Sequence, residues 1–466
     1  MDHRTASAEE EWDRRLVVHP GVAAGDYVHE RVVSADGSWL TFSDGRRLLD
    51  FNSQYACNNL GHGHPRIREA LHRAVDRMSH AVELFANDDR TRAAQLLLSE
   101  TMEGSDWAGS VRFTSSGSEA VEAATLFARL ATRRPIIVTR QIAYHGWTEG
   151  AGSLTSAPAS ANLLEGGNHP AVLPPRSAAV SIGPAVVSDE RDADGRLKCV
   201  VDTERHIRSV GVENVAAYVT ELWCGALGYG VPDDYPRQIR EMTKRLGILW
   251  IDDEVIAGMG RTGRWWAFQH HGVEPDLLVT AKALSSAAVP AGAVILSREV
   301  ADRISRQVFH SYSTFSGHQL AMAAVAATIE TMRDEKIVET TARRGEHLAR
   351  RLVELKQRHP SVGRVQGRGF AHALDLVRDA RTGALWVPQD RWWTPTLDGR
   401  PELFPGQYVA AACVRRGVLA FSFAPNTLMI NPPLTISDED LDFGLQAVDE
   451  ALGELDDYNA RHGGAA

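Results

Sequence analysis

The sequence is poor in cysteine and in long apolar runs, and each shortage excludes a class of protein. Its 466 residues include four cysteines, which lie far apart at Cys57, Cys199, Cys224 and Cys413. This spacing fits neither a metal knuckle nor a disulfide framework, and it agrees with a reducing cytoplasm. No apolar stretch reaches the roughly 18 uninterrupted residues of a membrane span. We therefore expect a cytoplasmic protein with no metal and no membrane partner.

Positive charge is also scarce. The formal charge is −10, the isoelectric point is near 6.0, and no long run of lysine or arginine occurs. This balance argues against a nucleic-acid partner. The opening stretch "MDHRTASAEEEWDRR" is polar and charged, so we expect no secretory signal in it. What remains is an ordinary globular composition, 44% hydrophobic and long enough for two or more packed domains.

Strand-like and helix-like segments alternate through residues 70–330. Residues 135–140, 215–222 and 246–255 form short, nearly continuous apolar runs, typical of strands buried on both faces of a parallel sheet. A helical pattern with one apolar face starts at Ser118. The alternation predicts an α/β core with a mostly parallel sheet flanked by helices.

The C-terminal third differs and predicts a smaller α+β domain. It contains a long charged helix pattern over Ile337–Arg358, strand-like residues 369–377 and a final helix near 437–452. Ser437 precedes Asp440 by three residues, as in a capping box. We divide the chain into an N-terminal segment, 1–70, that contributes to the small domain and the active site, a large domain, 71–330, and a small domain, 331–466.

A single lysine lies in the run "DLLVTAKALSSAAVPAGAVILS", residues 276–297. Between Asp276 and Arg298 the only charge is Lys282, and its neighbours are small or apolar. One interpretation is that its ammonium group reaches water. The other is that the amine is needed neutral, as a nucleophile toward a carbonyl.

Two other motifs carry chemistry and also have ordinary interpretations. In "VRFTSSGSEAVEAA" the small residues Ser115–Ser118 follow a strand and begin a helix, so they form either a simple helix cap or a phosphate site. In "LWIDDEV" acidic residues end a buried strand, where they either cap a helix or pair with a cation of a ligand.

A third motif points elsewhere. Gly258, Gly260 and Gly263 spell G-x-G-x-x-G, the dinucleotide fingerprint. The fingerprint belongs between a strand and a helix, yet "RWWAFQHHGVEPD" follows and is a poor helix former. The sequence therefore disfavours nicotinamide binding.

Together, the lone lysine, the acidic strand end and the small-residue helix start suit one cofactor. A pyridine ring that carries an aldehyde and a phosphate needs an amine, a carboxylate for its ring nitrogen and a phosphate cup. These three motifs therefore predict one binding site.

Longer motifs in a fixed order give a more specific signal. They are "DGRRLLDFNSQYACNNLGHGHPRIREAL", "FTSSGSEAVEAA", "AYHGWTEGAGSLT", "DEVIAGMGRTG", "EPDLLVTAKALSSAAVPAGAV", "STFSGHQLAMAA" and "PPLTIS". Over residues 26–455 the chain resembles the class III aminotransferases of pyridoxal-phosphate fold type I, closest to the ω-transaminases. The resemblance implies a seven-stranded sheet, pyridoxal 5'-phosphate, small-molecule amine and carbonyl substrates, and a homodimer with shared active sites.

The implied reaction moves an amino group from an amine or amino acid to a keto acid, aldehyde or ketone, in a ping-pong cycle through a pyridoxamine form. Relatives with other chemistry stay open: an aminomutase, an amino-acid epimerase or a decarboxylating enzyme, all of which use the same lysine and aspartate. A cofactor-binding protein without catalysis is disfavoured, because the lysine, the aspartate and the cup are all intact.

The resemblance also implies a role for individual residues. Lys282 is the Schiff-base lysine and proton shuttle, Asp253 pairs with the ring nitrogen, and Glu221 lies near the phenolic side of the cofactor. The implied phosphate ligands and ring contacts are Ser116, Gly117, Ser118, Tyr144, His145, Val255 and, from the neighbouring subunit, Thr314. The implied substrate pocket contains Tyr55, Ala56 and Trp147.

The chain departs from the family in several places. Leu222 follows Glu221 where proline is usual, Ala283 replaces a commoner glycine, and Ala56 stands where many ω-transaminases have tryptophan. Residues 162–177 and the loop 381–406, with Trp392 and Trp393, match nothing general. These tryptophans either pack on the surface or form a wall over the substrate entrance.

Many ω-transaminases also carry a mobile arginine, shortly before the "PP" motif, that clamps a carboxylate. After Arg416 this chain has neither arginine nor lysine before Pro432, and it has Phe421, Phe423 and Pro425 instead. Either another arginine such as Arg391 acts as the clamp, or one substrate lacks an α-carboxylate at its reacting carbon.

Overall fold

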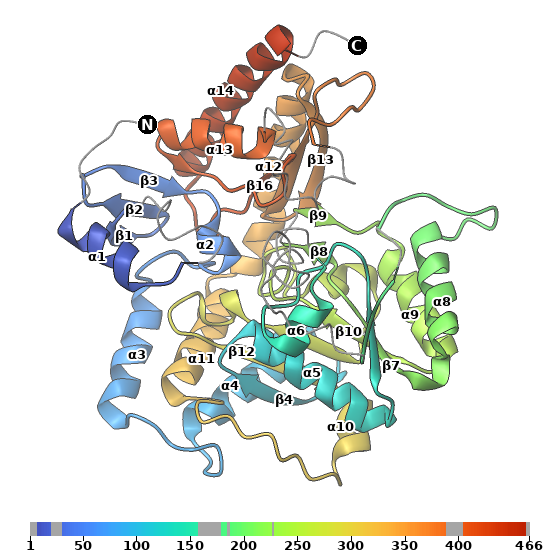
Figure 1. The fold of residues 1–466 in the computed structure, drawn as a ribbon. Helices are drawn as coiled ribbons and strands as arrows, with labels where there is room; N and C mark the ends of the chain where they lie inside the picture. Colours follow the sequence, from blue (N-terminus) through green and yellow to red (C-terminus); the bar gives the residue numbers. More distant parts are fainter. Residues whose placement is uncertain are drawn as a thin grey trace.

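A computed structural model describes residues 7–19, 30–156, 179–183, 187–225, 228–387 and 404–462. Its centre is a seven-stranded sheet with the order β4-β12-β11-β10-β7-β5-β6 (Figure 1). The strands are β4 (Ala108–Thr114), β5 (Ile136–Thr139), β6 (Val180–Ile182), β7 (Val215–Thr220), β10 (Leu249–Asp253), β11 (Leu277–Thr280) and β12 (Gly292–Ser297). Strand β12 is antiparallel to both neighbours and the other pairs are parallel. The predicted, mostly parallel sheet is confirmed.

Successive residues of the central strands point to opposite faces of this sheet, and both faces are apolar. Val219, Ile251 and Val279 pack with α5 (Gly117–Thr132) in one cluster of buried residues. Tyr218 and Trp250 belong to the larger cluster on the other face. That cluster also involves α8 (Lys198–Val210), α9 (Tyr235–Leu246), α4 (Asp88–Ser99) and α11 (Gln319–Asp334). The sheet is therefore covered by helices on both faces.

The remaining described elements form smaller units around the sheet. The helices are α1 (Ala8–Leu16), α3 (Pro65–Arg77), α6 (Glu149–Leu154), α10 (Arg298–Ile304), α12 (Ile337–Arg358), α13 (Pro405–Arg415) and α14 (Asp438–His462). The strands are β1 (Val32–Asp36), β2 (Trp39–Phe42), β3 (Arg47–Asp50), β8 (Trp223–Cys224), β9 (Tyr229–Gly230), β13 (Val362–Arg368), β14 (Ala371–Leu376), β15 (Val418–Leu419) and β16 (Thr427–Ile430). The long helix predicted over 337–358 is confirmed with the same bounds.

Strand β15 comes late in the chain but pairs in parallel with β3 near the N-terminus. It completes a four-stranded sheet of order β1-β2-β3-β15, beside the three-stranded sheet β13-β14-β16. Figure 1 shows these N-terminal strands next to α13 and α14, above the large sheet. Strands from the N-terminal and C-terminal parts of the chain therefore share one sheet.

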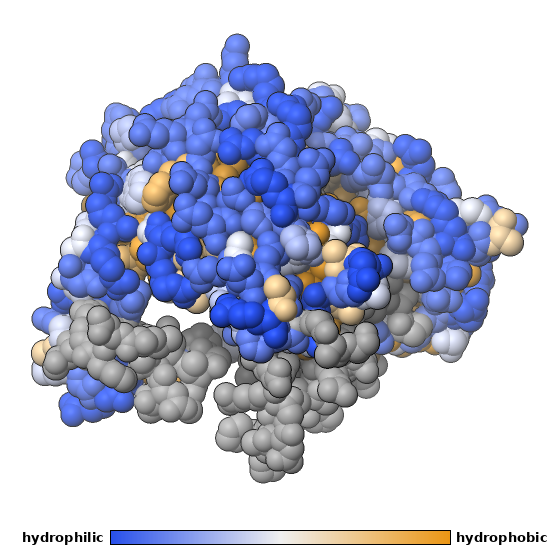
Figure 2. Space-filling view, turned by 90° about the horizontal axis from the view of Figure 1, so that it is seen from above, coloured by the Kyte–Doolittle hydropathy of each residue, from blue (hydrophilic) through white to orange (hydrophobic). Residues whose placement is uncertain are grey.

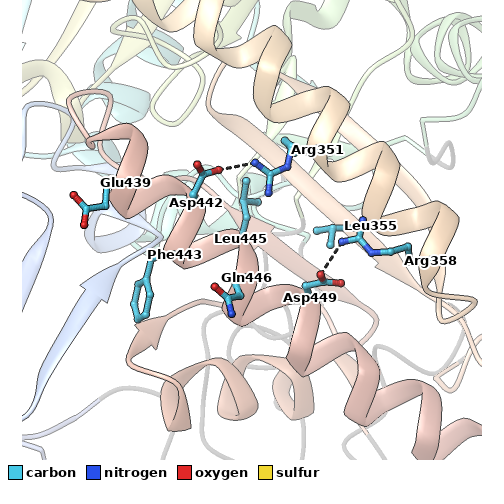
Figure 3. Close-up of a pocket in the computed structure, with 9 residues that line it drawn as sticks. All are labelled: Arg351, Leu355, Arg358, Glu439, Asp442, Phe443, Leu445, Gln446 and Asp449. Atoms are coloured by element: carbon cyan, nitrogen blue, oxygen red, sulfur yellow. Dashed lines mark hydrogen bonds and ion pairs between the residues drawn. The ribbon is translucent and has the colours of Figure 1, made fainter.

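Ion pairs line a groove between α12 and α14 (Figure 3). An Arg351 nitrogen lies 2.5 Å from Asp442, and an Arg358 nitrogen lies 2.7 Å from Asp449. Ser437 begins the final helix as predicted, because its Oγ accepts a hydrogen bond from the Asp440 N–H at 3.0 Å. The groove is separate from the candidate site described below and shares no residue with it.

Hydrophilic residues cover most of the face seen from above, with small scattered hydrophobic patches between them (Figure 2). Within the described ranges, no helix has the length and hydropathy that crossing a membrane requires. Cys57, Cys199, Cys224 and Cys413 are free thiols in this structure.

Candidate active site

Lys282 lies between β11 and β12, at the first position of the short 3-10 helix Lys282–Ser285. Its φ of +48° is in the left-handed region, a strained conformation for a lysine that is typical of functional sites. The side chain is half-buried. Burial lowers the pKa of Lys282 below its usual range, although Cys57, Asp253 and Glu221 oppose this shift. Of the two interpretations left open by the sequence, this environment favours the neutral amine.

Asp253 ends β10 on the sheet face that α5 covers. Its Oδ2 lies 2.7 Å from His145 Nδ1, and its Oδ1 accepts a hydrogen bond from the Val255 N–H at 3.1 Å. An ionised carboxylate only accepts, so Nδ1 carries the proton in this contact. A second contact orients the His145 imidazole, because its Nε2 lies 3.3 Å from the Thr139 hydroxyl. The Asp253 carboxylate is therefore fixed at the strand end.

The two acids beside Asp253 have other surroundings. Glu254 accepts hydrogen bonds from the backbone N–H groups of Ala267 and Phe268, at 2.6 and 2.9 Å. Burial raises the pKa of Glu254 to about 7. Burial and the neighbouring Glu254 raise the pKa of Asp252 well above its usual range. Because strand residues alternate, Asp252 lies on the opposite face from Asp253. Asp253 is thus the acid of this motif suited to a ligand cation.

The small residues after β4 form the start of α5. The helix begins at Gly117, and Ser116 caps it with an Oγ that accepts the Glu119 N–H at 3.2 Å. A Cβ on Gly117 would lie 3.4 Å from side-chain carbons of both Ala281 and Val255. The helix start therefore faces the strand end of Asp253 and the residue before Lys282. The helix-cap interpretation is confirmed, while the phosphate role stays a prediction.

The segment from Tyr144 to Trp147 packs against Glu221 and the start of α5. The Tyr144 N–H donates to Glu221 Oε2 at 3.1 Å, and the Trp147 N–H donates to Ser118 Oγ at 3.3 Å. Gly146 has a φ of +132°, and a Cβ there would lie 2.4 Å from Ser118 Oγ. Only glycine permits this close approach. Burial, with Asp253 and Glu221, raises the pKa of Tyr144, so its hydroxyl stays neutral.

These groups fit pyridoxal phosphate. The fit rests on the donor set: a lysine with a lowered pKa, a carboxylate held for a protonated nitrogen, and free backbone N–H groups at the start of a 16-residue helix. Gly117 lies against Ala281 and Val255, and Lys282 is within electrostatic range of Asp253, so the three groups are neighbours in the fold. Within the described ranges, no group of three or more histidine, cysteine or acidic side chains is arranged to hold a metal ion.

The proposed substrate pocket lies beside an unusual turn. Ser53, Gln54, Tyr55 and Ala56, labelled α2 (Ser53–Ala56), all have φ values between +49° and +63°. A left-handed turn costs an L-residue about 1–2 kcal/mol per position. Buried bonds hold it in place: Arg261 Nη2 donates to Ser53 Oγ, which in turn donates to the Asn431 carbonyl. No glycine or asparagine in these four positions signals this turn.

The turn carries Tyr55 into an aromatic trio with Phe421 and Phe423. The ring of Tyr55 lies 4.8 Å from that of Phe421 and 5.2 Å from that of Phe423, centroid to centroid. Ala56 is buried, whereas Trp147 is 80% exposed and Thr314 is exposed. Residues 157–178 and 388–403, which include Arg391, Trp392 and Trp393, lie outside the described ranges.

The dinucleotide motif has a structural explanation. Gly258 lies against the Trp266 ring, and Gly260 and Gly263 have φ values of +83° and +88°. The next element is a short 3-10 helix, Ala267–His271, rather than a long helix that could hold a pyrophosphate. The expectation that this motif is not a nucleotide site agrees with its place in the fold.

Comparison with known proteins identifies relatives of the whole chain. The family model "Aminotransferase class-III" matches residues 22–452. An S-selective transaminase from Arthrobacter sp. has a structure with a TM-score of 0.90 and 37% identity, and the match covers 97% of this chain and 98% of that one. Acetylornithine aminotransferase of Archaeoglobus fulgidus is 34% identical, over 78% of this chain and 88% of that protein. Putrescine–pyruvate aminotransferase of Pseudomonas aeruginosa is 30% identical, over 88% of each chain.

Proposed function

The chain belongs to the class III aminotransferases, which depend on pyridoxal 5'-phosphate, and from this premise we propose how its own residues divide the work. It transfers an amino group between an amine or amino-acid donor and a carbonyl acceptor. When bound, the cofactor supplies an aldehyde and an electron-withdrawing ring. The observation that carries the assignment of roles is that Lys282 is within electrostatic range of Asp253, while the start of α5 packs on Ala281 and Val255 beside them.

Lys282 acts as the base. Its Nζ takes the proton that leaves the reacting carbon of the substrate and later returns a proton. A general base must be unprotonated at working pH, and burial lowers the pKa of Lys282 toward that state. The small neighbours Ala281 and Ala283 leave space beside the amine.

Asp253 and the start of α5 orient the cofactor. The Asp253 carboxylate keeps the ring nitrogen protonated, and its bonds to His145 and Val255 fix its direction. Ser116, Gly117 and Ser118 would hold the phosphate on backbone N–H groups and hydroxyls. Tyr144 and Val255 would contact the ring, and Glu221 would act on its phenolic side.

We propose a homodimer in which Thr314 completes the site of the partner. Large apolar side chains are exposed near Thr314, at Leu84, Phe85, Val308, Tyr312 and Phe315. The segment that contains Leu84 and Phe85 lies beside the segment 308–315, because the ring centroids of His80 and Phe315 are 5.5 Å apart. Several exposed apolar side chains from neighbouring segments favour an interface with a second copy. We also place the enzyme in the cytoplasm, which agrees with its four free thiols.

For the substrate, we propose a donor or acceptor with an apolar group and no α-carboxylate. Arg415 and Arg416, the last arginines before Pro432, form ion pairs of 2.6–2.9 Å with Glu450 and Glu454 of α14. Both guanidinium groups are therefore paired within the small domain and do not serve as the carboxylate clamp. The trio of Tyr55, Phe421 and Phe423 supplies an aromatic wall in place of a clamp.

The test of the reaction is a half-reaction. Holoenzyme incubated with an amino donor alone should release about one equivalent of carbonyl product per subunit and then stop until an acceptor is added. An aminomutase or epimerase would release no stoichiometric carbonyl, and a decarboxylating enzyme would release carbon dioxide. Either result would replace the aminotransferase assignment.

A further inference from the structure

Arg140 is a buried cation behind the site that the reaction scheme above does not use. It follows β5 and is 1% exposed. Its Nη1 donates to Thr220 Oγ1 at 2.8 Å, and its guanidinium carbon lies 5.5 Å from the Tyr229 ring centroid. Among the described residues, neither Nε nor Nη2 has a hydrogen-bond partner. A buried guanidinium in this state needs an anion nearby, because unpaired buried charge is very costly.

Glu221 is that anion. Its Oε2 lies 3.9 Å from Arg140 Nη2, and the side chains are 5% and 1% exposed. This separation is too long for a hydrogen bond, yet an ion pair at this distance is strong where water is excluded. The same oxygen accepts the Tyr144 N–H. Glu221 therefore lies between the arginine and the segment that carries Tyr144 and His145.

Glu221 is also within electrostatic range of Lys282. The ionisable and polar groups that face Glu221 are Arg140, Tyr144, His145, Tyr229, Asp253 and Lys282. Burial raises the pKa of Glu221, and Asp253 raises it further, whereas His145 and Arg140 lower it. Without its arginine, a carboxylate buried beside Asp253 would have a still higher pKa, which favours its protonated form.

We propose that Arg140 is a positioning residue that keeps Glu221 ionised and, through Glu221, sets the proton affinity of the Lys282 nitrogen. The inference rests on the roles proposed above for Lys282 and Glu221. An ionised Glu221 favours a protonated Lys282 nitrogen. When Glu221 becomes neutral, that nitrogen loses its proton at a lower pH. Arg140 itself acts on Lys282 only weakly, because Glu221 stands between them.

The experiment is a pH titration of the visible absorption band of the holoenzyme, which reports on the nitrogen contributed by Lys282. Arg140→Met and Glu221→Gln should each lower the midpoint, by about one pH unit. The double variant should be no lower than Glu221→Gln alone. Thr220→Val removes a neutral partner of Arg140 and no charge, so its midpoint should match the wild type. Arg140→Lys keeps the charge, so its midpoint should stay close to the wild-type value.

A second readout follows Glu221 directly. Relative to the wild type, Arg140→Met should gain infrared carboxylic-acid absorption at pH 7, with or without cofactor, and the double variant should lack this gain. An unmoved midpoint and no new band would overturn the inference, and so would equal shifts in Thr220→Val and Arg140→Met. If Arg140→Met does not fold, Arg140→Gln takes its place with the same outcomes. A wild-type protein without any band from Lys282 would instead overturn the proposed function.

Discussion

His145 Nδ1 lies 2.7 Å from Asp253 Oδ2, although 108 residues separate the two in sequence. The imidazole connects the Thr139 hydroxyl to the carboxylate that we assign to the ring nitrogen of the cofactor. At metal sites, groups that orient a ligand usually contribute 10–100-fold to affinity or activity, and we expect the same order of magnitude for His145. Substitution of Asp253 and of His145 should therefore lower kcat to different extents.

Asp253→Asn should retain cofactor but lower kcat by roughly a thousandfold or more, because the ring nitrogen loses its proton and the reaction loses its electron sink. His145→Gln should lower kcat by about 10–100-fold, and the double variant should be no slower than Asp253→Asn. Steady-state kinetics with a saturating donor measure these effects. Asp252→Asn, on the other sheet face, is the matched control. Near wild-type turnover in Asp253→Asn, with a slow Asp252→Asn, would transfer the role to Asp252.

Lys282→Ala should abolish both turnover and the visible band of the bound cofactor, because no other described lysine contributes to the site. Absorption spectra of purified protein measure the band. Lys198→Ala is the control, since Lys198 is exposed and forms only a surface ion pair of 3.2 Å with Glu190. A band of wild-type intensity in Lys282→Ala would remove this residue from its assigned role.

Local sequence predicts most helices and strands of the fold, but it does not predict their tertiary contacts. The 22-residue helix Ile337–Arg358 and the buried strands have clear periodicity, and the sequence predicts them. The final helix runs ten residues beyond the predicted end at 452, to His462. Tyr458 explains the extension, because its ring packs 5.6 Å from Trp386 and 5.8 Å from Tyr408. Such tertiary contacts override weak local signals.

Within the candidate site, the motifs predicted residue types and order, whereas side-chain partners required the fold. The bond between His145 and Asp253 needs β5 and β10 to end on the same edge, with β7 between them. The left-handed turn at Ser53–Ala56 is imposed by Arg261 and the Asn431 carbonyl, which no local pattern reveals. Local sequence does not reveal the role of Arg140, because this cation pairs with Glu221, which directly follows β7.

Asp375, on β14, should make the melting temperature depend on pH. Burial raises the pKa of Asp375 to about 6, against the lowering effects of Arg364, Gln366 and Thr427. In the unfolded chain its pKa is about 4, so between pH 4 and 6 the folded state holds a proton that the unfolded state releases. Asp375 therefore lowers stability as pH rises through this window, and the loss is complete above pH 6.

Asp375→Asn should remove this pH-dependent loss of stability, since an amide does not ionise. Relative to the wild type, the variant should gain about 2 kcal/mol between pH 4 and 7, seen as a rise in the difference of melting temperatures. Thermal unfolding of cofactor-saturated protein at both pH values measures it. A constant difference across the window would show that Asp375 ionises normally. The exposed Asp442→Asn should show no comparable rise.

Thr314 tests the shared site. A Lys282→Ala subunit mixed with a Thr314→Asp subunit should form dimers with one restored site, which joins Lys282 of one copy to Thr314 of the other. The aspartate is chosen because its charge repels a phosphate. Activity should rise above that of both parents after subunit exchange and approach half the wild-type value per heterodimer. No gain after confirmed exchange would place Thr314 in its own site or outside the reaction.

The aromatic trio predicts substrate preference. With no arginine or lysine between Arg416 and Pro432, a carboxylate at the reacting carbon has no partner in that segment, while Tyr55, Phe421 and Phe423 present ring surface. An arylalkyl amine without a carboxylate should therefore react faster than alanine or glutamate in the half-reaction. Phe423→Ala should lower kcat/KM for that amine by roughly tenfold or more and change the value for alanine less than about threefold, because one lost ring contact amounts to about 1–3 kcal/mol. Phe443→Ala, a partly exposed ring on α14 outside the trio, should change neither. If alanine or glutamate outruns every amine tested, and Phe423→Ala slows all donors equally, the trio does not select the substrate and a carboxylate partner must lie elsewhere, with Arg391 the first residue to replace.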